Sequence, residues 1–497
     1  MLGYALRALA LKPVQRWSPE RIAALQHRRL QALVRYAIAH SPHYRDRFHA
    51  VNPDRFRLTD LPPISKTELM ADFDRTVTDR SIRRADLERF VDNPANEGRW
   101  FLGRYAVSHT SGSQGQPLLM VSDRRHLELL FALQQTRGYT GKVTPLTALQ
   151  KLIDPARLAV VTLKKGFYPS ASAFEYMPPG PRRFMKVLRL SQTDPDVVEQ
   201  LNRFRPTALT AYASVLDMLA LEVEAGRLQL APELQQVVNN SECLSDAARQ
   251  RISRAFGLHV LNNYATGECP FLTNGCPTDE GAHVNADWAI LEVVDDQNNP
   301  VPPGQPGRKV LITNLANRVQ PIIRYEVGDI VTMATEPCRC GSRLPRVLKI
   351  EGRAADTFYI KDGDSYRQLI NSVFKNAFDY TREVREWQAI QVERNKVVIK
   401  LELLPGHTLN HDHAWWSLER QLRMYDFYGK LDLSLEVVPR LTSDQPSGKF
   451  RRMVSLVGPP GSPDSHRASA KLRHDPPHST PHPILSPHLA GKQIPES

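Results

Sequence analysis

The stretch Ser108-His-Thr-Ser-Gly-Ser-Gln-Gly-Gln-Pro117 is the most informative part of the sequence. A strand-like segment at 104–107 precedes it, and a helix-like segment begins at Asp123. Gly112 and Gly115 permit positive φ angles and close backbone approach, so several N–H and hydroxyl groups can converge on one anion. No Gly-Lys-Ser/Thr closes the loop, which excludes the common P-loop. Taken alone, the stretch is more typical of a solvated Ser/Gly turn, so its assignment depends on the rest of the chain.

The composition predicts a multi-domain globular protein. The chain has 497 residues, 41% of them hydrophobic, which is too long for one ordinary core. Its net charge of +12 arises from 65 basic residues scattered among 53 acidic ones, and no basic run with interleaved aromatics occurs. This pattern argues against nucleic-acid binding, while a basic surface favours attraction of small anionic ligands.

The sequence predicts a cytoplasmic protein without stable membrane insertion. No apolar run approaches the ~20 residues of a membrane span. Residues 1–12 lack the apolar core and cleavage site of a signal peptide, and a weak membrane-surface helix is the alternative for them. Five cysteines in a chain of this length do not make a disulfide framework, which favours a reducing compartment.

The order of apolar patterns predicts an α/β fold with mixed and parallel sheets and covering helices. Residues 19–49 are typical of an amphipathic helix. From about 105 to 265, short apolar runs alternate with helical patterns, which indicates parallel sheet. The strands are expected at 158–163, 208–212, 236–238 and 259–261, and the helices at 196–204, 214–224 and 246–256. A strand-rich region follows, with strands expected at 288–294, 309–313 and 329–333.

Three parts are expected along the chain: a large domain over 1–353, a small mobile α+β domain over 354–456, and a tail over 457–497. The small domain is expected to contain strands at 388–392, 397–403 and 431–437 and helices at 366–378 and 414–424. The tail holds nine prolines and five histidines with almost no apolar periodicity, which is typical of disorder.

Five further short motifs follow the opening loop in order. They are Asn240-Ser-Glu-Cys-Leu-Ser-Asp246, Asn263-Tyr-Ala-Thr-Gly-Glu268, Arg324-Tyr-Glu-Val-Gly-Asp329, Glu351-Gly-Arg-Ala-Ala-Asp356 and Pro446-Ser-Gly-Lys449. Each alone is more typical of a helix cap, a surface turn or a solvated charge. Their order resembles the adenylate-forming (acyl-activating) enzyme superfamily, and within it phenylacetate–CoA ligases and their relatives in capsule and coenzyme-modifying pathways. The resemblance covers roughly residues 20–455, including Arg35-Tyr36 and Ser41-Pro-His-Tyr-Arg45.

The resemblance implies a role for each motif. The large domain would bind ATP and a small-molecule carboxylic acid, and the small domain would be a lid that carries Lys449. Thr110, Ser111, Gly112, Ser113 and Gly115 would hold the ATP phosphates. The adenine would be lined by Ser241, Glu242, Asn263 and Tyr264. Glu268 would bind Mg²⁺, and Asp329 and Arg353 would hold the ribose. His109 would orient the acid, with a structural histidine as the alternative.

The chemistry implied by the resemblance is attack of a carboxylate on the α-phosphorus of ATP, with release of pyrophosphate. Backbone donors, Mg²⁺ and Lys449 suit the charge that develops on the phosphoryl oxygens. A domain rotation would then admit coenzyme A for thioester formation. Ala355 replaces an acidic residue usual at the hinge, and Glu326 stands where Arg is common. Two alternatives stay open: an adenylyl transferase that stops at AMP transfer, and a non-catalytic nucleotide-binding relative.

The cysteines indicate a second candidate site. Cys338 and Cys340 form a short knuckle, and Cys276 with His283 lies upstream. Three thiolates and an imidazole are the ligand set of a structural zinc, with free reduced thiols as the alternative. Cys243 and Cys269 are interpreted as buried small hydrophobes. The aromatic residues of region 140–190 are interpreted as ordinary core, with an acid-binding wall or a homodimer contact as alternatives.

Overall fold

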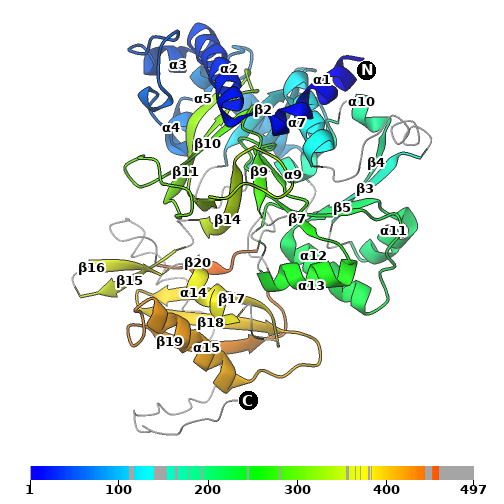
Figure 1. Ribbon diagram of the computed structural model, residues 1–497, viewed down its shortest axis with the longest axis vertical. Coiled ribbons are helices and arrows are strands. Elements are labelled where there is room, and N and C mark those ends of the chain that lie inside the picture. The colour runs from blue at the N-terminus through cyan, green and yellow to red at the C-terminus, as the bar shows by residue number, and fades with distance from the viewer. Residues whose placement is uncertain are drawn as a thin grey trace.

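The structure of the protein is a computed structural model. It describes residues 2–110, 117–138, 154–162, 166–177, 179–191, 194–242, 244, 246–278, 281–353, 357–363, 365–369, 371–378, 381, 383–442 and 450–457. The fold is α/β with mixed and parallel sheets, as predicted. Figure 1 shows a large unit, residues 2–353, above a smaller C-terminal unit that spans residues 357–457. Residues 458–497, nearly all of the predicted tail, lie outside the described ranges.

The N-terminal region is helical. Its helices are α1 (Leu2–Leu11), α2 (Pro19–His40), α3 (Pro42–Arg47), α4 (Lys66–Ala71), α5 (Phe73–Thr76) and α6 (Arg84–Asp92). The single helix predicted over 19–49 is instead two helices, because Pro42 has no N–H to continue the α2 ladder. Ser41 then caps α3, and its Oγ accepts a hydrogen bond from the N–H of Tyr44 at 3.4 Å.

The large unit contains a five-stranded parallel sheet, in the order β4-β3-β5-β6-β7. Its strands are β3 (Ala156–Thr162), β4 (Met185–Ser191), β5 (Ala208–Ala211), β6 (Gln236–Asn240) and β7 (Val260–Asn263). The helices α11 (Val197–Phe204), α12 (Ala213–Glu224) and α13 (Asp246–Phe256) pack on one face of it. The predicted alternation of strands and helices is confirmed, and β4 is a strand that the sequence analysis did not predict.

Antiparallel strands make up the rest of the large unit. The hairpin β1 (Tyr105–His109) and β2 (Leu119–Asp123) leads into α7 (Arg124–Arg137). One sheet contains β10 (Ala289–Val294), β11 (Lys309–Asn314) and β12 (Ile322–Val327). Another has the order β13-β14-β9-β8, with β8 (Thr273–Gly275), β9 (Ala282–Val284), β13 (Asp329–Met333) and β14 (Arg346–Arg353). The opening loop therefore joins two antiparallel strands, and β2 intervenes before the helix that follows Asp123.

The C-terminal unit has a sheet of its own, in the order β19-β18-β17-β20. The strands are β17 (Val384–Glu393), β18 (Lys396–Leu403), β19 (Asp432–Val438) and β20 (Met453–Ser455), with the helices α14 (Asn371–Phe378) and α15 (His411–Met424). The helix predicted at 366–378 is wrong in its first turn, because β16 (Ser365–Leu369) pairs with β15 (Phe358–Asp362) as a hairpin.

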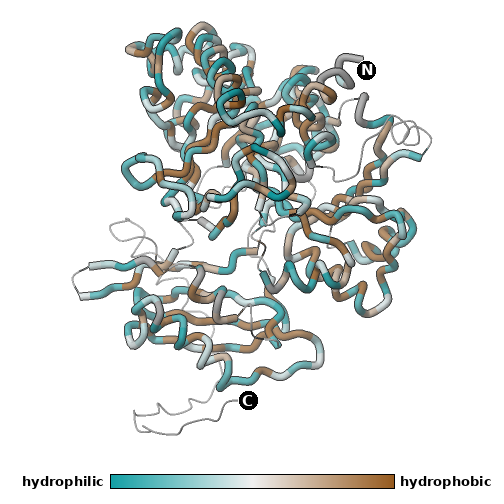
Figure 2. The backbone as a smooth tube through the Cα atoms, in the orientation of Figure 1, coloured by the Kyte–Doolittle hydropathy of each residue, from teal (hydrophilic) through white to brown (hydrophobic). Residues whose placement is uncertain are grey.

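The apolar residues gather in the strands at the centre of each unit, whereas the outer helices have mixed hydropathy (Figure 2). In the C-terminal unit, Trp387 is 1% exposed and packs with Phe374 and Phe378. Among the described helices, none has both the length and the apolarity that a bilayer span requires.

Candidate functional site

The base of the opening loop is the end of the β1–β2 hairpin. Thr110 lies at this point, where its N–H donates to the carbonyl of Leu118 at 3.0 Å and its Oγ1 accepts from the N–H of Leu118 at 3.0 Å. The ring of His109 contacts Tyr168, with centroids 5.0 Å apart, and its Nδ1 lies 2.9 Å from the carbonyl oxygen of Thr110. The hairpin therefore fixes both ends of the loop, whose residues Ser111, Gly112, Ser113 and Gly115 lie outside the described residues.

A second motif loop, Tyr264 to Glu268, passes directly over this hairpin. Gly267 lies at the closest approach, since a Cβ there would lie 2.7 Å from Cε of Met120 and 3.3 Å from Cγ2 of Thr110. The end of the flexible Met120 side chain would have to shift to admit a larger residue, so the glycine favours the close contact of the two loops. Glu268 follows at once, with 9% of its surface exposed. Among the residues that the structure describes, none forms a hydrogen bond or an ion pair with the Glu268 carboxylate. Asn314 donates instead to the backbone carbonyl oxygen of Glu268 at 2.9 Å.

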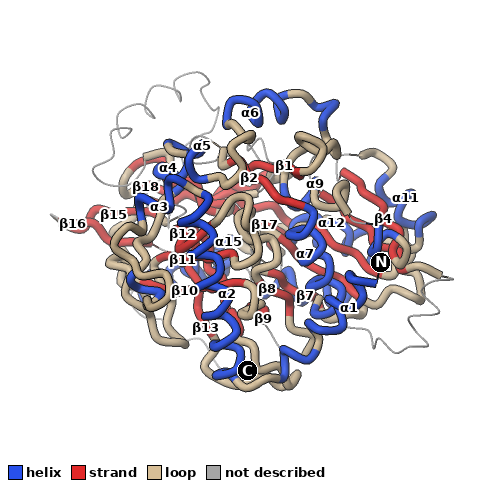
Figure 3. The backbone as a smooth tube through the Cα atoms, turned by 90° about the horizontal axis from the view of Figure 1, so that it is seen from above, coloured by secondary structure: helices blue, strands red, loops and turns tan. Residues whose placement is uncertain are grey.

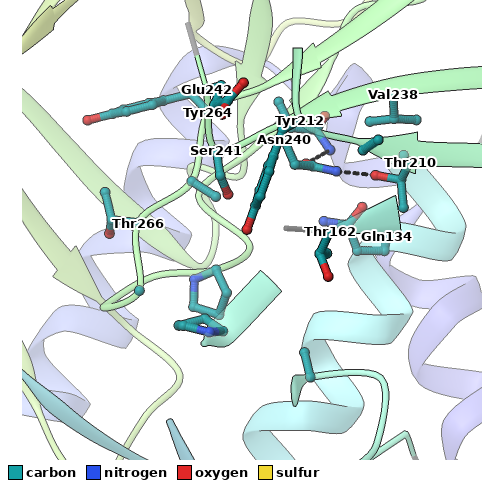
Figure 4. A pocket seen from close by; sticks show the side chains of 18 of the residues that line it. Gln134, Thr162, Thr210, Tyr212, Val238, Asn240, Ser241, Glu242, Tyr264 and Thr266 are labelled. Carbon is teal, nitrogen blue, oxygen red and sulfur yellow. Dashed lines mark hydrogen bonds between the residues drawn. The ribbon is translucent and has the colours of Figure 1, made fainter. Parts of the chain in front are cut away.

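Asparagine side chains connect the carboxyl ends of the neighbouring strands β5, β6 and β7. Asn263 donates to Oδ1 of Asn240 at 3.0 Å. Asn240 in turn donates to Oγ1 of Thr210, as Figure 4 shows. Asn263 Oδ1 also accepts the N–H of Gly275 at 2.7 Å. The carboxyl ends of parallel strands are where open α/β sheets bind ligands. The network holds Asn240 and Asn263 rigidly at this edge.

Tyr264 links two of the predicted nucleotide motifs. Its hydroxyl donates to Oδ2 of Asp329 at 2.8 Å, and both residues are buried. Asp329 begins β13 and lies opposite Arg353 in the register with β14. Since a carboxylate has two oxygens, Asp329 keeps acceptor capacity for a further donor after binding Tyr264. The placement of the Arg353 side chain lies outside what the structure describes.

Glu242 occupies an unexpected position. Its Oε2 accepts the backbone N–H of Ser214 at 3.0 Å, and its Oε1 accepts the N–H of Phe450 at 3.4 Å. Burial raises the pKa of the Glu242 carboxyl, and the nearby Glu386 adds to that rise. The preceding Ser241 has φ +67°, a left-handed conformation that is uncommon for a side-chain-bearing residue and is often found at functional sites. The carboxylate thus faces the C-terminal unit as well as the cavity.

These loops surround one cavity of about 960 Å³. Its described lining residues include every predicted nucleotide- and acid-site residue whose side chain is described: His109, Thr110, Ser241, Glu242, Asn263, Tyr264, Glu268 and Asp329. The C-terminal unit contributes Phe450 to Met453, directly after Lys449, which lies outside the described residues. Motif residues spread over more than 200 positions of the sequence therefore meet at one place.

Several lining residues were not predicted. Thr162, Tyr212 and Thr266 lie in the cavity beside the motif residues, as Figure 4 shows. The signal for two of them was present, because Thr162 ends β3 and Tyr212 directly follows β5. Polar residues at the carboxyl ends of predicted parallel strands are candidates for ligand binding.

The structure explains the unusual residues of the Arg324 motif. The guanidinium of Arg324 is buried and binds both oxygens of Glu292 at 3.0 Å, and it donates to the carbonyl of Leu61 at 2.6 Å. Glu326 forms an ion pair with Lys309 at 2.8 Å. Arg324 therefore connects strands of the large unit. Ala355, the other departure from the resembled pattern, lies outside the described residues.

Cys276, His283, Cys338 and Cys340 come together at the end of the β13-β14-β9-β8 sheet. Their ligand atoms all lie within 4.8 Å of one another. The sulfurs of Cys276 and Cys338 are 3.3 Å apart, and Nε2 of His283 lies 3.3 Å from the sulfur of Cys340. Burial acts to raise the pKa of the Cys276 thiol, but hydrogen bonds from its neighbours, His283 foremost, outweigh burial and lower that pKa to about 5.

The surroundings of this cluster also suit a metal. His283 Nδ1 lies 3.2 Å from the carbonyl oxygen of Leu344, which fixes the tautomer that leaves Nε2 free for a ligand role. Gly281 precedes the histidine with φ +94°, and a Cβ there would meet the carbonyl oxygen of Val347 at 2.2 Å. Cys269 is fully buried outside the cluster, as predicted, and Cys243 lies outside the described residues.

Comparison with known proteins identifies similar chains. No protein-family model matches. The chain is 26% identical over 466 residues to a phenylacetate–coenzyme A ligase of Thermus thermophilus, covering 88% of this chain and 97% of that relative. A crystal structure of 2-hydroxyisobutyryl-CoA ligase in the postadenylation state, in complex with R3-HIB-AMP, has a TM-score of 0.66 at 20% identity, covering 89% of this chain and 91% of that one. The same ligase in complex with 2-HIB-AMP and CoA in the thioesterification state has a TM-score of 0.55 at 21% identity, again over 89% and 91%.

Proposed function

Because the chain has the fold of the adenylate-forming CoA ligases and the predicted resemblance to phenylacetate–CoA ligases is confirmed, we propose that it activates a carboxylic acid with ATP. The product of this step is an acyl-adenylate, pyrophosphate leaves, and coenzyme A then takes the acyl group as a thioester. One observation carries the proposal: residues of the opening loop and of four later motifs line the same cavity. Their shared location supports a single site for nucleotide and acid.

The proposed roles follow the chemistry of each lining group. The loop Thr110, Ser111, Gly112, Ser113 and Gly115 binds phosphate oxygens through backbone and hydroxyl donors. Asp329, oriented by the Tyr264 hydroxyl, accepts hydrogen bonds from the ribose together with Arg353. The adenine lies against Tyr264, Ser241 and Asn263. The backbone around Glu242 forms one side of this pocket.

The adenylation step is a displacement at phosphorus. A carboxylate oxygen of the acid, oriented by His109, forms a bond to the α-phosphorus while the bond to the pyrophosphate oxygen breaks. Negative charge increases on the phosphoryl oxygens, and Lys449 donates to them as a compact point charge. The buried carboxylate of Glu268, which no described residue neutralises, is a suitable ligand for Mg²⁺. A bound Mg²⁺ would offset phosphate charge in that step.

The second step requires a thiol in place of the lysine. The thiolate of coenzyme A attacks the acyl carbon, the bond to the adenylate oxygen breaks, and AMP leaves. Movement of the C-terminal unit gives each step its own set of residues. Adding coenzyme A to a working adenylation assay distinguishes this reaction from an adenylyl transferase, which would release no thioester.

A pyrophosphate-exchange assay with a panel of carboxylic acids tests the proposal. We expect exchange that depends on both the acid and Mg²⁺. Lys449→Ala and Glu268→Gln should each lower the exchange rate by about 100-fold or more, as loss of one electrostatic group does in other enzymes. Lys430→Ala, which removes a partly exposed ion pair with Asp362 in the C-terminal unit, is the matched control and should leave the rate unchanged. Absence of exchange with every acid, in folded protein, would refute the function.

We also propose that the cluster of Cys276, His283, Cys338 and Cys340 holds one structural zinc ion. Three thiolates and an imidazole form a closed site without an open position for catalysis. The zinc would connect the β8–β9 region to the chain before β14, which are about 60 residues apart in sequence. Its role is therefore stabilisation of the sheet that carries Asp329.

A further inference from the structure

The cavity has a second part that runs along one face of the parallel sheet. Alternate residues of three neighbouring strands line this part: Ala156, Leu158 and Val160 of β3, Ala208 and Thr210 of β5, and Gln236, Val238 and Asn240 of β6. We call this surface the sheet groove. The residues between them, such as Ala159, Leu209 and Val237, belong to the core with α11, α12 and α13. Because side chains alternate between the faces of a strand, the groove follows the strands from their carboxyl ends toward their amino ends.

The sheet groove is long. Val160 lies four positions after Ala156, which at ~3.3 Å per residue corresponds to about 13 Å along the strand. Aromatic rings in contact have centroids about 4.5–7 Å apart, so one ring occupies only about that much of the length. The groove is therefore longer than a single-ring acid needs. The total cavity of about 960 Å³ contains this groove together with the space between the motif loops.

Apolar side chains form the wall that faces the sheet. Leu130 and Phe131 come from α7, and Phe131 packs edge to face on Phe174 with centroids 6.0 Å apart. Phe184 and Met185, at the start of β4, also line the groove. At the far end lies α1, which runs alongside α7 in Figures 1 and 3 and contributes Tyr4, Ala8 and Leu9. The N-terminal helix therefore closes the groove at the end distant from the motif loops.

Several polar groups in the groove are already engaged in hydrogen bonds. The Tyr4 hydroxyl donates to Gln135 at 2.8 Å, and Gln236 donates to the carbonyl of Gly138. The groove is formed by described residues of α1, α7 and the parallel strands, together with the residues that directly follow these elements. Among these lining residues, only Lys12 carries a charge, and it is exposed. A ligand in the groove therefore meets mainly apolar surface, which rewards burial of hydrocarbon.

We infer that the acid is an extended hydrophobic one, either an unbranched chain or a row of linked rings. Its carboxylate lies at the carboxyl ends of the strands, near Thr162, and its tail lies in the sheet groove toward α1. This inference rests on the proposed function, because it assigns the substrate class of the same site. Length and apolarity together exclude compact polar acids as preferred substrates.

A graded series of acids tests the inference in the pyrophosphate-exchange assay. The series runs from acetate through hexanoate to dodecanoate, with benzoate and biphenyl-4-carboxylate as ring acids. Each methylene buried in the groove is expected to raise kcat/KM by about fourfold until the tail reaches α1. Biphenyl-4-carboxylate should exceed benzoate by at least tenfold. A preference for acetate or benzoate over every longer acid would overturn the inference and leave the proposed function intact.

A variant that shortens the groove gives an independent test. Ala208 lies near the amino end of β5, so Ala208→Trp fills the distant part of the groove while leaving the carboxyl ends of the strands unchanged. We expect at least a tenfold loss of kcat/KM for dodecanoate and less than a threefold change for hexanoate. Lys186→Trp, at an exposed position of the neighbouring β4, is the matched control and should change neither.

A second substitution keeps the test decisive if Ala208→Trp does not fold. Ala156→Phe narrows the groove at the partly exposed start of β3 and should also act selectively on long acids. Equal losses for long and short acids in folded variants would contradict the inference. Absence of exchange with every acid in the unmodified protein would refute the proposed function instead, so the two failures are distinguishable.

Discussion

Glu242 of the large unit accepts the backbone N–H of Phe450 of the C-terminal unit at 3.4 Å. The same carboxylate accepts the N–H of Ser214, at the start of α12, at 3.0 Å. Phe450 directly follows Lys449 in the sequence. One buried carboxylate therefore fixes the chain beside the proposed catalytic lysine to a helix that packs on the parallel sheet.

Glu242→Ala is expected to slow adenylation selectively. It leaves two backbone N–H groups without their acceptor, at a cost of about 1–3 kcal/mol for each buried group. The proposed adenylation needs Lys449 in place, whereas thioester formation from a supplied acyl-adenylate does not. Pyrophosphate exchange should fall by about 10-fold to 100-fold, which corresponds to the cost of the unpaired N–H groups. Thioester formation should change by less than about threefold, because that step does not need Lys449.

The control for this variant is Glu222→Ala. Glu222 lies on α12, the helix that contains Ser214, and binds Arg227 near the surface, so its loss should affect neither half-reaction. Equal slowing of both half-reactions by Glu242→Ala would contradict the positioning role, because general damage to the fold affects both steps alike.

A charged contact between the units supplies a second prediction. Asp217 of α12 binds Arg251 of α13 through two hydrogen bonds of 3.0 and 3.1 Å, and Arg251 donates to the carbonyl of Arg385 in β17 at 3.0 Å. Nε of Arg385 itself lies 3.9 Å from Asp217. The side chain of Asp217 is only 8% exposed. Removing one partner of such a buried group leaves uncompensated charge, at a cost of about 3–5 kcal/mol.

We therefore expect Asp217→Ala to loosen the C-terminal unit. Limited proteolysis should cleave the segment between the units faster, and thermal unfolding should begin at a lower temperature. Lys375→Ala is the matched control, because Lys375 crosses the same contact to Asp246 at 3.3 Å from a more exposed position. If both variants were cleaved at the rate of the unmodified protein, the charged contact would not hold the units together.

Local patterns in the sequence were sufficient to predict much of the fold. The apolar run of β3 and the helical period of α12 each lie within a few residues, so the alternation of strands and helices could be recognised. The stretch of β16 was assigned to a helix, because its true partner is β15 and pairing between strands leaves little local signal. The strand β4 was missed for a related reason, since only one edge of it is paired within the parallel sheet.

The candidate site, like the fold, could be predicted from the sequence only in part. Cys276, His283, Cys338 and Cys340 could be grouped from sequence because few residue types bind zinc. The bond from Glu242 to Phe450 could not be predicted, because it joins two units whose relative placement no motif encodes. The sheet groove is likewise formed by ordinary apolar residues, and only the three-dimensional arrangement distinguishes them from core.

His126 leads to a prediction about acid stability. Burial lowers the pKa of His126 from 6.5 to about 4. Asn314 donates to its Nε2 at 3.2 Å, so Nδ1 carries the proton and faces Ser122 Oγ at 2.9 Å. His126 binds a proton near pH 6.5 in the unfolded chain and only near pH 4 in the folded chain. The contribution of the neutral, buried His126 to the free energy of unfolding is therefore complete above pH 6.5 and is lost as the pH falls to 4.

The shift corresponds to roughly 3 kcal/mol of unfolding free energy between pH 6.5 and 4. His126→Gln keeps a donor and an acceptor but cannot be protonated in this range. Urea unfolding across these pH values should show a flatter profile for His126→Gln than for the unmodified protein. His411→Gln, at an exposed position on α15, is the control and should leave the profile unchanged. A profile for His126→Gln as steep as that of the unmodified protein would show that other groups cause the acid sensitivity.

The proposed zinc site is tested by metal analysis together with stability. Cys338→Ser replaces a sulfur that lies 3.3 Å from that of Cys276, so the variant should lose the metal that the unmodified protein holds at one ion per chain. Because binding free energy at a structural site contributes to folding, the variant should also unfold at a lower temperature, and a chelator should lower the unmodified protein toward the same value. Cys269→Ala is the control, since Cys269 is buried outside the cluster and its loss leaves all four ligands in place. Purified protein without zinc, unaffected by chelator, would show that the four side chains hold no structural metal ion.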